Sequence, residues 1–391
     1  MPKRLVYLDN AATTPVRPEV LEAMLPYLGR DVFGNPSSAH RFGRAARAGV
    51  EEAKRAIAEA LGAEPGQVIF TSGGTEADNL AVIGAALAAR DRGGPFRVAV
   101  SAIEHKAVLA AAHAVVHLGG EEIILPVDGA GAVSAEALDE ALGRGVAIVC
   151  VMWVNNEVGA VQAVARLAAR CREAGVPFHV DAVQAFGKIP VSLRDVPCTL
   201  LTLSGHKIGA PKGIGALIVR DRHVVEAIIH GGGQQFGIRP GTENVPGIVA
   251  LGKAVELAGR EQAEFAARVA ALRDELERRL VAVVPDAVIN AARGPRAPHV
   301  SNVSIPGTDS EALLMHLDLA GIACSSGSAC STGAVEPSHV LTAMGVPREL
   351  GVAALRFSFG KDNTMEDVEA VAAAFPKIVE KVRALSAVLH R

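Results

Sequence analysis

Between about residues 41 and 220, short apolar runs alternate with longer segments whose apolar residues recur at the 3.6-residue spacing of an amphipathic helix. The short runs predict strands at 68–72, 97–102, 122–125, 147–152, 178–182, 200–204 and 216–219. The longer segments predict helices at 41–61, after Thr75, after His105 and near 163–174. Strands that alternate with helices of this size form a mostly parallel sheet covered on both faces, so we predict an α/β domain here.

The pattern changes beyond this region. A long amphipathic helix is predicted at 262–283, because apolar residues recur at short helical intervals with charges between them. The chain continues with a predicted strand at 302–306, a helix near 309–320, a Gly/Ser-rich stretch at 324–333, a strand at 354–359 and a last helix from 364. This order predicts a smaller α+β unit, with which the N-terminus packs. We therefore predict a large domain over 15–261 and a small domain built from 1–14 and 262–391.

Composition limits the possible partners. The chain has 391 residues, and a single hydrophobic core stops growing near ~250 residues, which predicts about two domains. The formal net charge of -3 lacks the basic excess that phosphate-backbone binding requires, so we expect no nucleic-acid partner. The first apolar residues are soon interrupted by Asp9 and Asn10, which predicts neither a signal peptide nor a spanning helix. We expect a cytoplasmic protein with no membrane partner.

The cysteines favour a thiol function over a structural one. Their number, five, is odd and no CxxC pair occurs, so we expect neither a disulfide framework nor a metal site. Cys330 stands in the stretch CSSGSACSTGAVEPSH, whose composition packs loosely, and a thiol on such a loop can reach a substrate as a thiolate. The alternative is a buried cysteine that acts as a small hydrophobe. That alternative better describes Cys150, Cys171 and Cys198 and leaves Cys324 undecided.

Residues 71–79, TSGGTEADN, lead from a predicted strand through two glycines into a helix that starts near Thr75. Glycines let the backbone approach a ligand, and free N–H groups at a helix N-terminus attract anions, so this turn is a candidate phosphate site. A tight turn in which Thr75 caps the helix explains the same residues equally well. No complete GxGxxG or P-loop pattern occurs in the sequence, so dinucleotide and P-loop binding are not indicated.

Two further candidates stand at the ends of predicted strands. Asp181, in FHVDAVQ, lies at the edge where open α/β sheets bind ligands, and a protonated pyridine nitrogen would suit its carboxylate. The alternative is that Asp181 caps the following turn. Lys207, in SGHK, could have there the lowered pKa that imine formation requires, whereas most lysines are simply solvated.

Three polar residues have two possible explanations each. His105, in SAIEHKAV, could stack on a planar cofactor or cap a helix, and Asn156, in VNNEVG, could donate to a ring oxygen or form a turn. Arg356 lies in the apolar strand ALRFSF, where a guanidinium needs a carboxylate partner. An amino-acid substrate or a structural salt bridge would supply that carboxylate equally well.

These segments belong to a longer series of motifs. In order, the chain contains YLDNAATTP, GNPSSAHRFG, TSGGTEADN, EHKAV, VNNEVG, HVDAVQ, SGHK, PKGIGAL, RPGTEN, SSGSACSTG and LRFSFG. The series resembles the cysteine desulfurases of the class V aminotransferase family, in the group that includes the nitrogenase-associated and housekeeping iron-sulfur enzymes. It runs unbroken from residue 7 to about residue 360, and several motifs in fixed order are far more specific than any one of them.

The resemblance implies a PLP-dependent transferase of fold type I, active as a homodimer. Lys207 would bind pyridoxal 5'-phosphate (PLP) and later move the substrate α-proton, while Asp181 would pair with the pyridinium nitrogen and His105 would stack on the ring. The other implied cofactor contacts are Gly74, Thr75, Ser204 and His206 at the phosphate, Thr242 at the phosphate across the dimer interface, and Asn156 and Gln184 at the ring oxygen. The implied substrate contacts are Arg356 at the carboxylate, with Asn156 and Asn35 assisting.

The implied activity is removal of sulfur from L-cysteine, which gives L-alanine and a persulfide on Cys330. The sulfur would pass to an iron-sulfur scaffold or another sulfur-acceptor protein, with Cys330 as a candidate transient ligand of an iron-sulfur cluster. The sequence leaves the acceptor open. The alternatives are a selenocysteine lyase, another PLP lyase or an aminotransferase, and a non-catalytic subunit of a sulfur-transfer complex.

Overall fold

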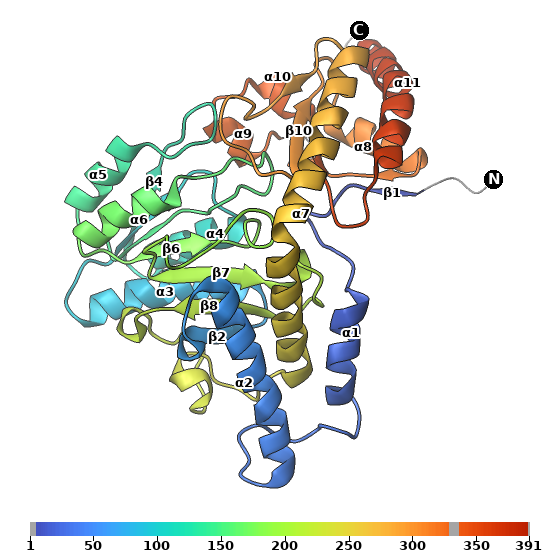
Figure 1. Cartoon of the computed structure of the whole chain (residues 1–391). Coiled ribbons are helices and arrows are strands. Elements are labelled where there is room, and N and C mark those ends of the chain that lie inside the picture. The colour runs from blue at the N-terminus through green and yellow to red at the C-terminus, as the bar shows by residue number, and fades with distance from the viewer. Residues whose placement is uncertain (1–4, 328–335, 390–391) are drawn as a thin grey trace.

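The computed structural model of the chain describes residues 5–327 and 336–389 (Figure 1). Its larger part is built on a seven-stranded sheet with the order β2-β8-β7-β6-β5-β3-β4. The strands are β2 (Val68–Thr71), β3 (Arg97–Ser101), β4 (Glu121–Leu125), β5 (Ile148–Cys150), β6 (Phe178–Asp181), β7 (Leu200–Ser204) and β8 (Gly215–Val219). Within this sheet β8 alone runs antiparallel to its neighbours, so the predicted mostly parallel sheet is confirmed.

Helices cover both faces of this sheet. Successive strand residues point to opposite faces, so each strand packs against both layers of helices. Val98 and Val100 pack toward α3 and α4, whereas Ala99 between them packs with residues of α2, α6 and α7 on the opposite face. The bounds of these helices other than α7 are α2 (Arg41–Leu61), α3 (Gly74–Asp91), α4 (Lys106–His117) and α6 (Val164–Glu173). Burial on both faces explains why the strands read as continuous apolar runs.

Helix α7 (Val245–Val283) is a single helix of 39 residues that runs through both parts of the molecule (Figure 1). The sequence predicted its second half, whose buried residues recur every three or four positions at Val269, Leu272, Leu276 and Leu280. The first half is buried on most of its surface in the large core, so it lacks a one-sided apolar stripe. The predicted boundary between residues 261 and 262 falls inside this helix, and the division into two domains stays a prediction.

A smaller unit with its own core follows α7. Its antiparallel sheet has the order β12-β10-β9, and a short parallel pair joins the N-terminal β1 to β11. Phe357, Phe375 and Leu8 are buried in its core. The bounds are β1 (Val6–Tyr7), β9 (Val288–Ile289), β10 (Val300–Ser304), α8 (Ser310–Leu319), β11 (Ile322–Ala323), α9 (His339–Ala343), α10 (Arg348–Gly351), β12 (Ala354–Ser358) and α11 (Met365–Leu389).

Several short elements were not predicted from the sequence. They are α1 (Pro18–Met24), α5 (Ala135–Gly143) and the 3-10 turns Leu25–Tyr27, Pro65–Gln67, Gly205–Lys207, Arg222–Val224 and Gln234–Gly237. Helix α5 begins after Ser134, whose hydroxyl accepts a hydrogen bond from the Ala137 N–H at 3.1 Å. Elements of this length span too few turns for a helical period to stand out from the sequence.

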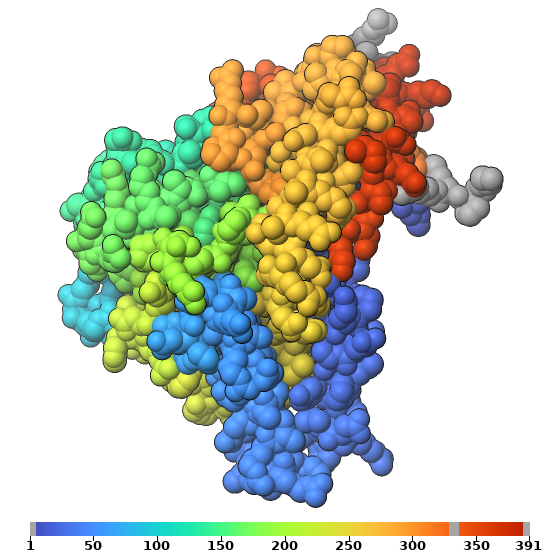
Figure 2. Space-filling view, in the orientation of Figure 1, coloured from blue at the N-terminus to red at the C-terminus, as the bar shows by residue number. Residues whose placement is uncertain are grey.

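The N-terminal segment, residues 5–17, lies against both units. The space-filling view shows it beside α7 and beside the residues that follow β12 (Figure 2). Glu261 of α7 ties the three together, because its carboxylate lies 2.9 Å from Arg17 and 3.7 Å from Lys361. Among the described residues, no helix is both long enough and apolar enough to cross a membrane.

Candidate active site

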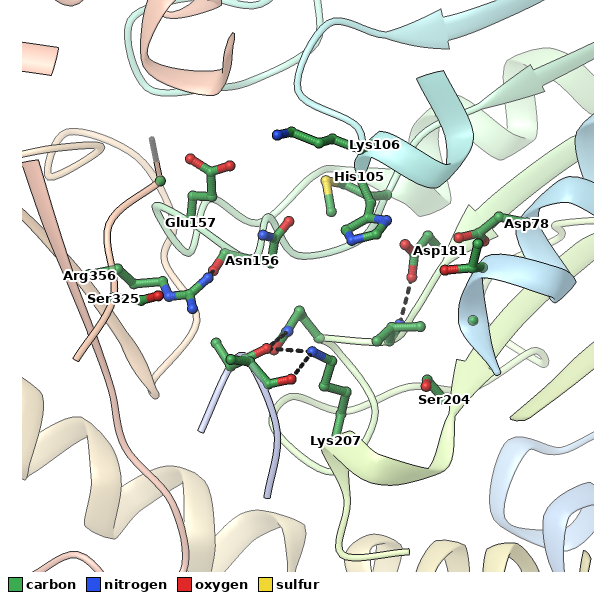
Figure 3. Close-up of a pocket in the computed structure, with 18 of the residues that line it drawn as sticks. Asp78, His105, Lys106, Asn156, Glu157, Asp181, Ser204, Lys207, Ser325 and Arg356 are labelled. Carbon is green, nitrogen blue, oxygen red and sulfur yellow. Dashed lines mark hydrogen bonds between the residues drawn. The ribbon is translucent and has the colours of Figure 1, made fainter. Parts of the chain in front are cut away.

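A cavity of about 450 Å³ opens at the carboxyl ends of β6 and β7, the edge where open α/β sheets bind ligands (Figure 3). Both units line it, and Ala11 and Ala12 of the N-terminal segment form part of its wall. Of the predicted site residues, those that line this cavity are Gly74, Thr75, His105, Asn156, Asp181, Gln184, Ser204, His206, Lys207 and Arg356.

Lys207 projects into this cavity from the 3-10 turn that follows β7 (Figure 3). Its Nζ donates hydrogen bonds to the backbone carbonyls of Ala11 at 2.7 Å and Ala12 at 2.6 Å. Burial, together with the charge of the nearby Arg356, lowers the pKa of Lys207 to about 8, while Asp181 opposes the shift. The amine is therefore neutral far more often near neutral pH than a solvated lysine is, which makes it a competent nucleophile.

Asp181 ends β6 and is 4% exposed. Its Oδ1 accepts a hydrogen bond from the Val183 N–H at 2.8 Å, and burial raises its pKa to about 6. Asp78 of α3, also buried, lines the same end of the cavity, and burial together with Asp181 raises its pKa. The Asp78 Oδ1 makes no hydrogen bond with a described residue and lies 3.6 Å from His179 Nε2. This end of the cavity is rich in acceptors, so it suits a cationic donor.

His105 lies at the start of α4 with its ring in the cavity (Figure 3). Its Nδ1 accepts a hydrogen bond from the Ala107 N–H at 3.1 Å, so the ring proton belongs on Nε2. Burial lowers the pKa of His105, and the Lys207 charge lowers it further. A helix cap and a cavity-facing ring were alternatives in the sequence, and the residue combines both.

The start of α3 forms the side of the cavity proposed for a phosphate. Gly74 and Thr75 line it together with Ser204 and His206. A Cβ on Gly74 would lie 3.2 Å from Val183 Cγ2, tighter than ordinary packing, so the close approach favours glycine. The His206 Nδ1 lies 3.1 Å from the Thr13 hydroxyl, and burial lowers the pKa of His206 to about 4. A neutral ring and free helix N–H groups are compatible with a bound anion.

Arg356 of β12 lies on the opposite side of the cavity from Asp181 (Figure 3). Its Nη2 donates to Asp9 Oδ1 at 2.7 Å and its Nη1 donates to the Asn156 carbonyl at 3.1 Å. Its buried Nε makes no hydrogen bond with a described residue. The structural salt bridge considered for this arginine therefore exists. These contacts use two of the five N–H donors of the guanidinium, so it retains donors for a ligand in the cavity that it lines.

Gln184 is held on both sides of its amide. Its Nε2 donates to the Ala11 carbonyl at 2.9 Å, and its Oε1 lies 3.2 Å from His299 Nε2. This arrangement fixes the Gln184 side chain at the cavity wall. Asn156 also lines the cavity, and its backbone carbonyl accepts the hydrogen bond from Arg356 Nη1.

Two of the predicted residues that the structure describes, Thr242 and Asn35, do not line this cavity. Both are exposed. The Asn35 Oδ1 accepts a hydrogen bond from the Ser37 N–H at 2.9 Å in its own turn. Cys330 lies outside the described residues. The roles of these three residues stay predictions.

The four cysteines that the structure describes have unreactive surroundings. Cys150, Cys171 and Cys198 are buried, as their apolar neighbours in the sequence predicted, and burial raises the pKa of each. Cys324, which the sequence left undecided, is half-buried, and its pKa is raised to about 12 mainly by burial. A thiol with so high a pKa is protonated at neutral pH and is a poor nucleophile.

Glu157 is a cavity residue that the sequence analysis did not single out. The Ser338 hydroxyl donates to its Oε2, and a Cβ on Gly327 would overlap the same oxygen. Its pKa is raised by burial. Gly327 and Ser338 are close to the two ends of the segment that carries Cys330, so Glu157 contacts both of its described flanks. The sequence feature that could have identified Glu157 is its position next to Asn156 in VNNEVG.

Comparison with known proteins identifies the family of the chain. The family model Aminotransferase class-V matches residues 6–371, so the chain belongs to this family. A cysteine desulfurase IscS from Dictyoglomus turgidum is 44% identical over 384 residues, which cover 98% of this chain and 97% of that protein. A solved NifS-like protein has a TM-score of 0.87 at 35% identity and covers 98% of this chain and 99% of its own. The predicted family and fold type are confirmed.

A second solved structure carries information about a ligand. SspA in complex with cysteine has a TM-score of 0.79 at 34% identity, with 90% of this chain and 98% of that chain covered.

Proposed function

We propose that the chain is a PLP-dependent cysteine desulfurase, which removes sulfur from L-cysteine and leaves L-alanine. The observation that carries the proposal is a single cavity in which Lys207, Asp181 and His105 meet. Arg356 faces them from the other side. Close relatives named cysteine desulfurase and the cysteine complex of SspA support the choice of substrate.

The cavity fits PLP because each part of that molecule has a matching partner. The buried Asp181 suits a protonated ring nitrogen, and the Lys207 amine suits the aldehyde. The N–H groups at the start of α3, with Ser204 and His206, suit the phosphate. When bound, PLP supplies an electron sink that stabilises negative charge on the substrate α-carbon.

The side chains of the cavity then position the substrate and move its proton. Arg356, which lines the cavity, binds the substrate carboxylate with its guanidinium and so directs the α-carbon toward Lys207. Lys207 takes the α-proton, because its lowered pKa keeps the amine available as a base. His105, with its proton on Nε2, faces the cavity, where it would stack on the bound ring and could donate that proton.

Cys330 accepts the sulfur in this proposal. Its thiolate attacks the substrate sulfur, so a sulfur–sulfur bond forms and the carbon–sulfur bond breaks, with its electron pair returning to the substrate carbon. A proton completes L-alanine, and Cys330 keeps the sulfur as a persulfide. The flanking Ser325 supports this role, since its backbone pairs with that of Arg356 at 2.7 and 3.1 Å beside the cavity.

We also propose that two copies form a homodimer in the cytoplasm. Thr242 and Asn35 are exposed and so remain accessible to a second copy, where Thr242 would reach the PLP phosphate. The persulfide would then pass to an iron-sulfur scaffold or another sulfur-acceptor protein.

The test is an assay of sulfide and alanine together, after incubation of the PLP-loaded enzyme with L-cysteine and a reductant. We expect equal amounts of both products from the wild type and none from Cys330→Ala, which should keep the visible absorbance of bound PLP. Cysteine turnover in Cys330→Ala would contradict the role of Cys330. Pyruvate in place of alanine would indicate another PLP lyase, and activity on selenocysteine alone would indicate a selenocysteine lyase.

A further inference from the structure

A second cavity, of about 430 Å³, adjoins the first. The N-terminal segment contributes Ala11 and Ala12 to the first cavity and Asn10 and Thr14 to the second, and Lys207 lines both. The second cavity lies where the N-terminal segment, α7 and the residues after β12 meet. A hollow between structural units is a common place for a small-molecule site.

Most charges around the second cavity are already compensated. The guanidinium of Arg17 lies 2.9 Å from Glu261 and 3.1 Å from Glu19. Lys361, at the rim, lies 3.7 Å from Glu261. Neither cation therefore needs a further anion.

Two lysines of this cavity are exceptions: Lys207, whose amine belongs to the active site, and Lys188. In the part of the chain that the structure describes, no carboxylate lies within the 4.0 Å of the Lys188 Nζ that would define an ion pair. The Nζ donates one long hydrogen bond, to the Lys207 carbonyl at 3.3 Å, and lies 4.7 Å from the centre of the Phe265 ring. An ammonium group has three donors, so this one retains capacity for an anion. Burial without a counter-ion lowers the pKa of Lys188 to about 8.

The rest of the lining decides what kind of anion fits. The apolar wall is formed by Pro15, Ile208, Ala258, Phe265 and Phe359. Glu261 and Asp362 stand at the same cavity and would repel a second negative charge on a ligand. One charge-assisted contact and an apolar wall together favour a small ligand with a single carboxylate and an apolar body.

We propose that this second cavity is a binding site for a small monocarboxylate, held by Lys188. The site is separate from the substrate carboxylate site at Arg356, because Arg356 lines the first cavity and not the second among the described residues. The proposal does not depend on the reaction that the enzyme catalyses.

The test is isothermal titration of the PLP-loaded enzyme with benzoate, with the neutral isostere benzamide as the ligand control. We expect saturable benzoate binding that benzamide does not match. Lys188→Met should weaken benzoate binding by about tenfold or more, because a charge-assisted hydrogen bond is lost. The matched variant Lys361→Met, at the rim of the same cavity, should change it less than about twofold. Arg356→Ala should retain the benzoate site.

Equal binding of benzoate by wild type and Lys188→Met would overturn the proposal, as would equal binding of benzamide or loss of all benzoate binding in Arg356→Ala. A second measurement needs no variant. Acetic anhydride at pH 8 should acetylate Lys188, and benzoate should slow that acetylation but not that of Lys361, as followed by peptide mass spectrometry. Unchanged acetylation of Lys188 at saturating benzoate would also overturn it.

Discussion

At one end of the active-site cavity, Asp181 ends β6 and Lys207 follows β7, and at the other end Arg356 lies on β12 of the small unit. The first two are fixed by backbone groups, namely the Val183 N–H and the carbonyls of the N-terminal segment. Arg356 is instead held by the side chain of Asp9 and a carbonyl of another loop. The groups suited to a cofactor thus lie at the ends of neighbouring strands of one sheet, with Lys207 also held by the N-terminal segment, whereas the position of the group suited to substrate depends on contacts among three separate segments.

This contrast extends to electrostatics. Burial moves the pKa of Lys207 down to about 8 and that of Asp181 up to about 6, so the sheet end is tuned by desolvation. At the other end Arg356 is compensated by a direct ion pair with Asp9. Changes at the sheet end should therefore alter the chemistry, and changes at the Arg356 end should alter substrate binding.

The largest effect should come from Lys207→Ala. The variant lacks both the amine that captures PLP and the base that moves the α-proton, so alanine formation should fall by at least about 10²–10⁴-fold. Activity and the visible absorbance of PLP after gel filtration measure the two losses. Substantial turnover in Lys207→Ala would mean that another group is the base.

Asp181→Asn should lower activity by about 10²-fold or more, because the buried charge opposite the ring nitrogen is lost.

The same substitution should stabilise the apoprotein. The raised pKa of Asp181 means that its contribution to stability is present below pH 3.8 and is lost as pH rises through about 6. The free energy of unfolding of the apoprotein at pH 7 should therefore rise by up to about 3 kcal/mol in the variant. Urea denaturation of both apoproteins checks this, and a less stable variant would contradict it.

Arg356→Lys should raise the KM for cysteine by about 10–100-fold with a smaller change in kcat, because a point charge replaces the fork that contacts Asp9 and substrate together. Steady-state kinetics at fixed PLP measure the split. Asp9→Asn is the matched control, since it frees the arginine without removing it. A drop in kcat with unchanged KM would place Arg356 at the chemical step instead.

The rate at which apoprotein captures PLP should rise about tenfold per pH unit below pH 8 and level off above it. The reason is that the neutral Lys207 amine is the nucleophile and its pKa is lowered to about 8. Stopped-flow absorbance between pH 6 and 10 gives the profile. A midpoint near that of a solvated lysine would show that the amine is not desolvated.

The smallest effect should come from Gly327→Ala, where the added Cβ overlaps the Glu157 carboxylate. We expect a loss of about tenfold or less in sulfide formation with cysteine affinity retained. Adding Glu157→Ala should restore part of the activity, because it vacates the space. A double-mutant cycle measures that coupling, and additive losses would contradict a direct contact.

The sheet end of the site could be predicted from the sequence because its signals are local. Asp181 is the last residue of the apolar strand β6 and Lys207 follows β7 by three residues, and parallel strands bring such ends to one edge. His105 follows β3 by four residues. The local sequence could not decide whether His105 caps a helix or faces the cavity. The residue does both, because its Nδ1 accepts the cap hydrogen bond and its Nε2 is left for the cavity.

The other end could not be predicted, because its contacts join residues far apart in the chain. The Arg356–Asp9 pair spans 347 positions and the Glu157–Ser338 pair spans 181. No sequence period links such residues. The first half of α7 was missed for a related reason, since a helix buried on most sides shows no polar face.

The central claim is that sulfur from cysteine ends on Cys330, and a single turnover tests it most directly. The PLP-loaded enzyme is mixed with one equivalent of L-cysteine per site without reductant, and its peptides are analysed by mass spectrometry while alanine is assayed. We predict that the peptide with Cys330 gains the mass of one sulfur atom and that one alanine forms per site. Alanine without added sulfur on that peptide, or sulfur on Cys324 instead, would contradict the account.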